Sequence, residues 1–262
     1  MITVDRAISR VRRDLTLATL LKFSLGVALA ACFTLGPDPI RFFGLVGIGA
    51  LWIWLSMNSA KGSRVAAASP ILIASGNYEE AERNIEQVVR TFSLFRAVKL
   101  QALHHLAVLR HAQRRWQESA TLSKALLGQR LGSLAPIGTS TRLLLADSLL
   151  EMHDLTGVHE TLNSLRRDQM SLGEMLKYQS LEIEYCTSIA AWDVVMEQVM
   201  NRVRLAELMP AGGSGRTQAM IALAALKREK TGLSSWLKAR AELLADVPAM
   251  LIERPMLREL WP

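Results

Sequence analysis

Two long apolar stretches, residues 15–35 and 40–58, lie next to each other near the start of the chain, and no comparable stretch follows. Only the turn-forming residues Gly36–Pro39 separate them, and the two prolines cannot continue a helix. A bilayer core about 30 Å thick is crossed by roughly 17–25 helical residues, so each stretch is long enough to cross once. The sequence therefore predicts a transmembrane helical hairpin over residues 15–59.

Basic residues flank this predicted hairpin. Four arginines precede the first span and Lys61 and Arg64 follow the second, whereas the connection holds only Arg41, beside Asp38. Lys and Arg resist translocation, so both flanks are expected to stay in the cytoplasm. We expect residues 1–14 to form a basic cytoplasmic N-terminal segment. The chain is then an integral protein of a bacterial plasma membrane, with both termini and the soluble domain cytoplasmic.

A second interpretation of the N-terminus rests on Cys32. The sequence Leu29-Ala30-Ala31-Cys32 resembles a bacterial lipoprotein box, whose processing would acylate Cys32 and export all that follows. Lipoproteins usually continue with a polar tether, but here the apolar run continues through Leu35. We therefore favour an ordinary cysteine within a span and keep the lipoprotein as an alternative.

The rest of the chain, residues 64–262, shows a helical pattern. Apolar residues recur at three- and four-residue spacing, as in Leu100, Leu103 and Ala107, without sustained alternation. The pattern predicts an all-α domain built from successive helix pairs. A glycine-rich stretch at residues 211–215 is expected to break the array as a flexible linker.

Similar turns recur between the predicted helix pairs. Trp116 follows Tyr78 by 38 residues, Leu155 comes 39 residues later and Trp192 another 37, and Leu233 closes the series after 41. Each bulky residue is expected to open the second helix of a pair, with a small or apolar residue three positions later on its buried face. The signature positions are Gly76, Tyr78, Ala81, Trp116, Leu155 and Trp192.

The segment Gly76-Asn77-Tyr78-Glu79-Glu80-Ala81 resembles the turn and second-helix start of a tetratricopeptide (TPR) repeat. Arg115-Trp116-Gln117-Glu118, preceded by Ala107, is a looser second example. The resemblance implies a TPR-like α-solenoid of about four to five helix pairs, whose concave face binds an extended peptide or a partner helix. The units here repeat every 37–41 residues, where TPR repeats have 34, and the Trp-x-x-Leu-Gly positions of the family are absent.

One segment is basic throughout. No Asp or Glu occurs from Gln87 through Gln117, whereas arginines, a lysine and three histidines do. This segment is either an ordinary solvated basic face or a surface that contacts anionic lipid head groups or an acidic partner. The candidate contact residues are Arg96, Lys99, Arg110, Arg114 and Arg115.

Motifs for chemistry are missing from the sequence. The five histidines lack nearby acids or cysteines in ligand spacing, and Cys186 is expected to be a core thiol. No nucleophile elbow or phosphate loop occurs. We expect no catalytic, cofactor or metal site. The net charge of +7 is spread over the chain, so no nucleic-acid partner is expected.

These patterns favour a membrane-tethered, non-enzymatic scaffold or adaptor that binds a protein partner and the lipid bilayer. Two alternatives stay open. One is an exported binding module of the lipoprotein type, acylated at Cys32, and the other is an accessory subunit of a membrane complex. The identity of the partner and the oligomeric state are not encoded in any motif of the sequence.

Overall fold

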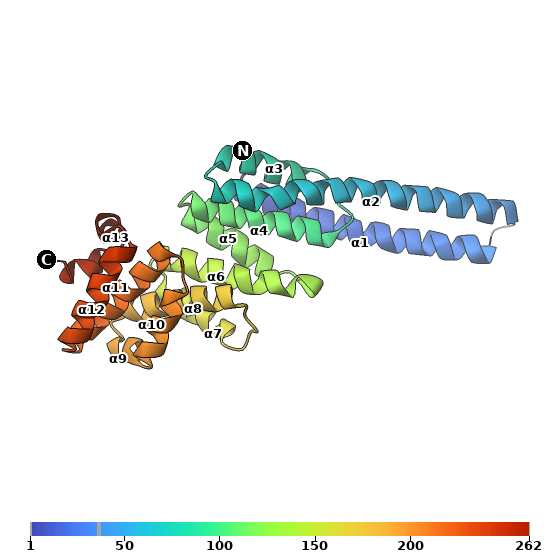
Figure 1. Cartoon of the computed structure of the whole chain (residues 1–262). Coiled ribbons are helices and arrows are strands. Elements are labelled where there is room, and N and C mark those ends of the chain that lie inside the picture. The colour runs from blue at the N-terminus through green and yellow to red at the C-terminus, as the bar shows by residue number, and fades with distance from the viewer. Residues whose placement is uncertain (1, 36–37, 262) are drawn as a thin grey trace. The chain divides into compact units, whose positions relative to one another are not determined.

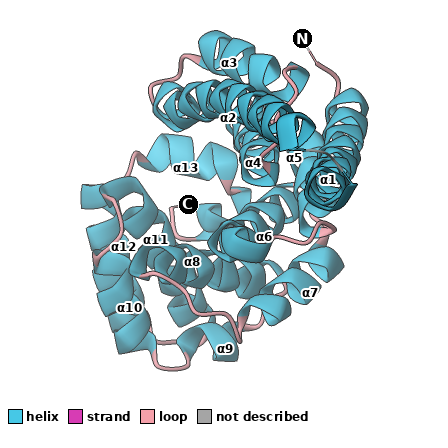
Figure 2. Ribbon diagram, turned by 90° about the vertical axis from the view of Figure 1, so that its right-hand side faces the viewer, coloured by secondary structure: helices cyan, strands magenta, loops and turns pink. Residues whose placement is uncertain are grey.

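A computed structural model describes residues 2–35 and 38–261 of the chain. Within these residues the secondary structure is helical, with thirteen α-helices, two short 3-10 helices and no strand (Figures 1 and 2). The all-α prediction is therefore confirmed for the described part. The chain divides into two compact units, unit 1 of Met1–Ser148 and unit 2 of Leu149–Pro262.

Unit 1 holds the first five helices and most of the sixth. Their bounds are α1 Val4–Leu35, α2 Asp38–Ala74, α3 Tyr78–Arg90, α4 Arg96–Ala112, α5 Trp116–Leu127, the 3-10 helix η1 Gly132–Leu134, and α6 Ala135–Glu151, whose last three residues belong to unit 2.

Unit 2 holds the remaining helices. Their bounds are α7 Leu155–Leu165, α8 Leu172–Ser188, α9 Trp192–Met196, α10 Val199–Glu207, α11 Ala211–Lys227, α12 Thr231–Leu244, α13 Val247–Glu253, and the 3-10 helix η2 Pro255–Glu259. Its core centres on α11, which is buried along most of its length and contacts α8, α9, α10 and α12.

The first half of α1 belongs to the core of unit 1. Its buried apolar residues recur at helical spacing, and the helix contacts α3, α4 and α5; these residues are Ala7, Val11, Leu15 and Ala18, and Ile2 just before the helix is buried as well. The sequence predicts residues 1–14 as a basic flanking segment, whereas residues 4–14 form a packed helix. The prediction relied on the four arginines and did not take account of the apolar residues that recur at helical spacing between them.

The α2 helix is continuous from the apolar stretch into the first helix–turn–helix unit. Residue 64, where the sequence predicted the start of the helical-repeat domain, lies inside it, and so do Gly62 and Ser63. A Cβ on Gly62 would lie 3.7 Å from Val98 and 3.9 Å from Val88, so the position is packed against α3 and α4. The apolar stretch and the helical units therefore share one rigid helix in place of a linker.

Five inter-helix turns have the same backbone geometry. The second residue after each first helix is left-handed, with φ of 78° at Gly76, 59° at Arg114, 58° at His153, 55° at Ala190 and 57° at Glu229. The next residue donates its N–H to the carbonyl five positions back, as Asn77 does to Leu72 (2.9 Å) and Lys230 to Ala225 (2.9 Å). This is the Schellman helix ending.

The signature residues occupy equivalent places in these turns. Tyr78, Trp116, Leu155 and Trp192 each begin the second helix of a pair. The residues three positions later are buried, and these are Ala81, Ser119, Val158 and Val195. The fifth second helix begins at Thr231, whereas the sequence predicted Leu233, so the fifth spacing was predicted too long.

First helices of successive pairs also contact each other at equivalent positions. In unit 1 the His104 ring lies 2.9 Å from the Thr141 hydroxyl, and in unit 2 Ser180 lies 3.3 Å from Thr217. Both pairs are 37 residues apart in sequence and fall at the same places relative to their turns. The described chain therefore repeats one helix–turn–helix unit.

The predicted glycine-rich break does not exist. Residues 211–215 form the first turns of α11. A Cβ on Gly215 would lie 2.7 Å from the Cβ of Ala245 and 3.3 Å from the Ala241 carbonyl oxygen. The absence of a side chain at Gly215 therefore allows α11 to pack closely against the end of α12. Here a glycine that suggested a flexible linker is required by a helix–helix contact.

Candidate functional site

The C-terminal half of α1 and the N-terminal half of α2 lie side by side and project from the rest of unit 1 (Figure 1). We call residues 19–35 and 38–54 the projecting hairpin, because Ala18 and Leu55 are the last buried residues at its base. Large apolar side chains are exposed along it, including Phe23 at 73% and Phe43 at 72%. Both helices are long and apolar enough to cross a membrane, yet only 11% and 6% of their most apolar windows are buried.

The exposed apolar length is shorter than the sequence predicted. Leu15, Ala18 and Leu55 lie within the predicted spans but are buried in unit 1. About 17 residues of each helix remain in the projecting hairpin, or roughly 25 Å at 1.5 Å per residue. That length is at the lower end of what a span requires.

Small residues bring the two helices of the hairpin together. A Cβ on Gly44 of α2 would lie 2.8 Å from the Cys32 sulfur of α1. Cys32 is thus partly buried between the helices. Gly26, Gly47 and Gly49 have no neighbour within 4 Å, so they leave shallow, unfilled positions on the outer faces.

A buried lysine joins three helices at the base of the hairpin. Lys99 of α4 lies 2.6 Å from the Asp14 carboxylate of α1, with side chains 0% and 5% exposed. Its ammonium also donates to the carbonyls of Val88 (3.1 Å) and Val89 (2.8 Å), which lie in the last turn of α3. Burial lowers the pKa of Lys99, and Asp14 offsets part of that effect.

Two further polar contacts hold α2, one against the connection that precedes α4 and one against α4 itself. The Ser59 hydroxyl accepts the Leu94 N–H at 2.9 Å. Pro70 lies inside α2 and lacks the N–H that would donate to the Ala66 carbonyl. The buried ring of His105 donates to that carbonyl instead, which compensates for a proline near the C-terminal end of this long helix.

Arg110 is the second buried cation of unit 1. Its guanidinium lies 2.8 Å from Glu82 of α3 and 3.2 Å from Glu118 of α5, and it donates to the Gln113 side chain at 2.7 Å. The hydrogen bond from Arg110 holds the pKa of Glu82 below its usual range. Arg110 therefore ties three consecutive helices together.

The five residues predicted as a basic contact surface do not form one exposed face. Lys99 and Arg110 are fully buried. Arg115 pairs with Glu118, and Arg96 donates to the Arg130 carbonyl at 3.0 Å. Arg114 is exposed at a turn.

The reason for this error is the origin of the carboxylates. No acid occurs from Gln87 to Gln117, but Asp14, Glu82 and Glu118 reach into the segment from other helices. A segment without acidic residues can therefore still have carboxylates beside its basic residues in the folded protein. The prediction that Lys99 and Arg110 contact lipid or a partner is wrong.

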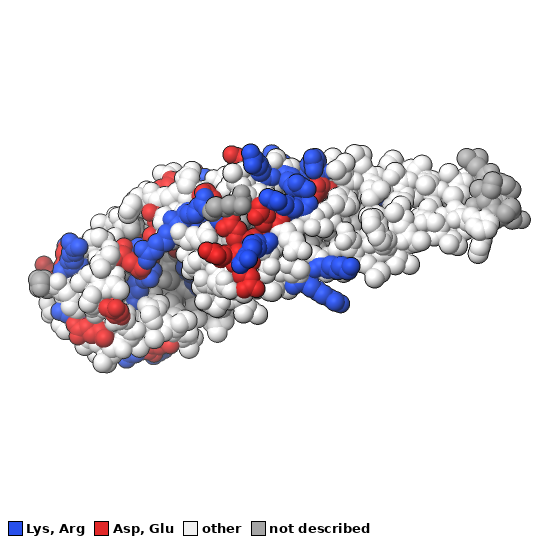
Figure 3. All heavy atoms as spheres, turned by 90° about the horizontal axis from the view of Figure 1, so that it is seen from above, with Lys and Arg blue, Asp and Glu red and all other residues white. Residues whose placement is uncertain are grey.

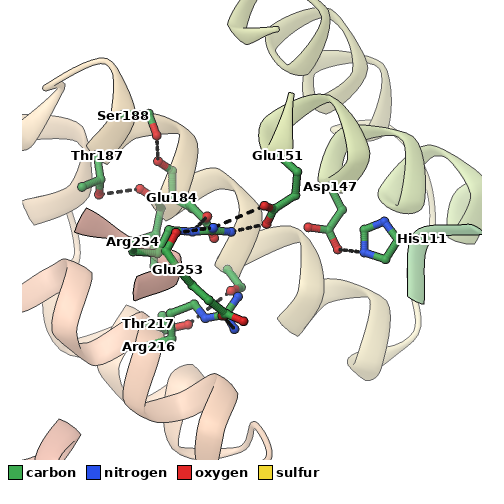
Figure 4. Close-up of polar contacts among 12 residues, drawn as sticks. His111, Asp147, Glu151, Glu184, Thr187, Ser188, Arg216, Thr217, Glu253 and Arg254 are labelled. Carbon is green, nitrogen blue, oxygen red and sulfur yellow. Dashed lines mark hydrogen bonds and ion pairs between the residues drawn. The ribbon is translucent and has the colours of Figure 1, made fainter. Parts of the chain in front are cut away.

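His111 makes polar contacts that connect neighbouring helices. His111 lies 3.2 Å from Asp147 (Figure 4) and 3.1 Å from the Ser148 hydroxyl, a set of residue types that recurs in serine hydrolases. Ser148 is fully buried, and its hydroxyl lies 3.0 Å from the Ser119 hydroxyl and 2.9 Å from the Leu144 carbonyl oxygen, so either can accept its single proton. A substrate cannot reach it, so the set links α4, α5 and α6.

An ion-pair cluster organises unit 2. Arg254, between α13 and η2, contacts Glu151 of α6 and Glu184 of α8 (Figure 4). Burial by itself would lower the pKa of Arg254, but the two carboxylates outweigh it and the pKa is raised. Nearby, Arg216 of α11 lies 3.0 Å from Glu253. These ion pairs hold the C-terminal segment of the chain against α8, α11 and the end of α6.

Cys186 is the buried thiol of unit 2. Burial raises the pKa of Cys186, which disfavours the thiolate needed for nucleophilic attack. No group of three His, Cys, Asp or Glu side chains within residues 2–35 and 38–261 is placed to hold a metal ion.

Four residues that form buried ion pairs were not predicted from the sequence, namely Asp14, Glu82, Glu184 and Arg254. A signal existed for Asp14, because it falls within the buried stripe of α1 between Val11 and Leu15.

Comparison of the chain with protein families, curated proteins and solved structures found no match.

Proposed function

We propose that the chain is a membrane-anchored helical-repeat adaptor without enzymatic activity. The projecting hairpin inserts into the bilayer, and the helix–turn–helix units, similar to TPR repeats, bind a protein partner. The observation that carries the proposal is the exposure of the aromatic and aliphatic side chains of the hairpin. In Figure 3 its described surface is largely free of charged side chains. So large an apolar surface is favourable in lipid and unfavourable in water.

The buried base of the hairpin supports one topology. Ile2–Ala18 and the residues after Leu55 pack in the same unit, so a hairpin inserted from its tip leaves both on one side of the membrane. The basic flanks favour the cytoplasmic side. Trp52 and Trp54 lie exposed next to the base, where an aromatic belt would meet the head groups.

The lipoprotein alternative is disfavoured by the Asp14–Lys99 pair. Cleavage before Cys32 would remove Asp14 together with the buried residues of α1, and Lys99 would keep no carboxylate partner. An uncompensated buried charge destabilises a fold by about 3–5 kcal/mol. Retention of α1 is the arrangement that this packing favours.

An accessory subunit of a membrane complex is the second candidate. Gly26, Gly47 and Gly49 leave open positions on the hairpin, and small residues of this kind let other transmembrane helices approach closely. In that case the hairpin would bind a partner as well as lipid.

Two double variants separate insertion from general hydrophobicity. Phe23→Glu with Ile53→Glu charges the hairpin, while Leu243→Glu with Ile252→Glu makes the same change at residues of unit 2 that are 86% and 76% exposed. After an alkaline carbonate wash we expect the wild-type chain and the unit 2 variant in the membrane pellet and the hairpin variant in the supernatant. Equal pelleting of both variants would remove the basis for a membrane anchor.

The same variants distinguish adaptor from subunit once a crosslinked partner is identified in membranes. An adaptor whose repeats bind the partner still captures it from a detergent extract when the hairpin is charged. A subunit held through its hairpin loses the partner in that extract.

A further inference from the structure

A pocket of about 570 Å³ in unit 1 is lined by four arginines and no acidic residue. Arg6, Arg10 and Arg13 come from one face of α1, since they are spaced by four and three residues. Arg90, the last residue of α3, closes the pocket from the other side, and Ile2 and Ser9 complete the lining.

The arginines of this pocket are only partly matched by carboxylates. Arg90 lies 2.6 Å from Glu86 of its own helix, and Asp14 is taken by Lys99. Arg10 donates to the Arg90 carbonyl at 2.7 Å, but its Nε is buried without a hydrogen-bond partner among the described residues. Arg6 and Arg13 are exposed. The pocket therefore concentrates positive charge.

The pocket lies close to the proposed membrane surface. The projecting hairpin begins six residues after Arg13, which is about 9 Å along the helix axis. Figure 3 shows Lys and Arg side chains gathered where the projecting hairpin, which carries few charged residues, joins the rest of unit 1. The head-group layer of a bilayer is roughly 5–8 Å deep, so the near end of the pocket falls at its edge.

We propose that this arginine pocket binds a phosphate group. A guanidinium donates two parallel N–H groups to a phosphate, and several of them together recognise a dianion or a phosphodiester better than isolated lysines do. The phosphate belongs either to the head group of an anionic phospholipid or to a soluble phosphate compound. The lipid source rests on the proposed membrane anchor, whereas the phosphate chemistry itself does not.

The test uses the full chain in an uncharged detergent. Arg6→Gln with Arg13→Gln removes two pocket charges and spares Arg10, which holds the end of α3. Arg12→Gln with Arg64→Gln is the control, because both residues are exposed, belong to unit 1 and do not line the pocket. Circular dichroism and a thermal melt verify that both variants are folded.

Two probes distinguish the sources. Inorganic phosphate is titrated by calorimetry, and phosphatidylglycerol and phosphatidylcholine are added in equal amounts before native mass spectrometry. We expect the pocket variant to bind one or both phosphate probes at least about tenfold more weakly, and the control less than about twofold.

Each outcome decides the proposal. Pocket-dependent retention of phosphatidylglycerol over phosphatidylcholine assigns the lipid head group, and pocket-dependent binding of inorganic phosphate alone assigns a soluble compound. No binding of either probe to the wild-type chain overturns the proposal, as does an equal loss in the pocket variant and the control. Either positive result holds in detergent even if the membrane anchor fails its own test.

Discussion

The Asp14 carboxylate of α1 lies 2.6 Å from the Lys99 ammonium of α4, and both side chains are almost completely removed from water. Because the ammonium also bonds the last carbonyls of α3, the base of the projecting hairpin is locked into unit 1. An Asp14→Asn variant leaves this charge unpaired and is expected to lose about 3–5 kcal/mol of unfolding free energy. Thermal unfolding of the full chain in detergent, followed by circular dichroism, measures the loss.

A double variant is the control for that prediction. Asp14→Leu combined with Lys99→Met removes both charges and keeps apolar volume, so we expect it to be more stable than Asp14→Asn by at least about 1 kcal/mol. If the single variant proves as stable as wild type, the pair does not hold the base.

The left-handed turn at Glu229 offers a stabilising substitution. Glu229 has φ of 57° and an exposed side chain, a conformation in which a Cβ is strained and glycine is not. We expect Glu229→Gly to raise the unfolding free energy by about 0.5–1 kcal/mol and Glu229→Ala to give no gain. Paired melting curves of the two variants test this. A destabilised glycine variant would show that the turn is unstrained.

Two glycines of α11 should respond to the same change in opposite directions. Gly215 has Ala245 only 2.7 Å from the position of an added Cβ, whereas Gly212 has nothing within 4 Å. Gly215→Ala is expected to destabilise unit 2 by about 1–3 kcal/mol through overpacking. Gly212→Ala is expected to stabilise it by up to about 1 kcal/mol through helix propensity. Similar effects at both positions would indicate that α11 and α12 do not pack as closely as described.

Acid should destabilise unit 1 through His104. Burial lowers the pKa of His104 to about 4 from its usual 6.5, and the neighbouring His105 adds to the shift. The unfolded chain therefore binds the proton first, so the stability is fully present above about pH 6.5 and is lost as the pH falls toward 4. We expect a loss of roughly 3 kcal/mol over that range.

Substitutions at two histidines identify the source of that loss. His104→Gln cannot take up the proton and should flatten the pH dependence of the melting temperature. His153→Asn is the matched control, because His153 is exposed and its φ of 58° is one that asparagine tolerates. An unchanged pH profile in the His104 variant would assign the acid sensitivity to other groups.

Local patterns predicted part of this fold. Apolar spacing and the turn residues identified the helix pairs, and Tyr78, Trp116, Leu155 and Trp192 begin second helices as expected. These features depend on residues that are close in sequence, and a local pattern can therefore predict them. The fifth turn carries Thr231 where the others carry a bulky residue, so its position was misjudged by two residues.

Long-range contacts were beyond such patterns. The burial of Lys99 and Arg110 depends on Asp14 and Glu82, and no local rule pairs residues so distant in sequence. Residues 211–215 misled for the reverse reason, since glycine serves both flexible linkers and close helix contacts. Composition alone does not separate the two uses.

The insertion of the projecting hairpin is tested most directly by spin labels on the full chain in phospholipid vesicles. Single cysteines replace Val27 or Val46 on the hairpin, or Leu243 in unit 2, in a chain with Cys32→Ala and Cys186→Ala; these three positions are 53%, 54% and 86% exposed. Power saturation then compares collisions with oxygen and with a water-soluble nickel chelate. The account predicts high oxygen and low nickel accessibility at residues 27 and 46, and the opposite at residue 243. Nickel accessibility at residues 27 and 46 equal to that at residue 243 would contradict it.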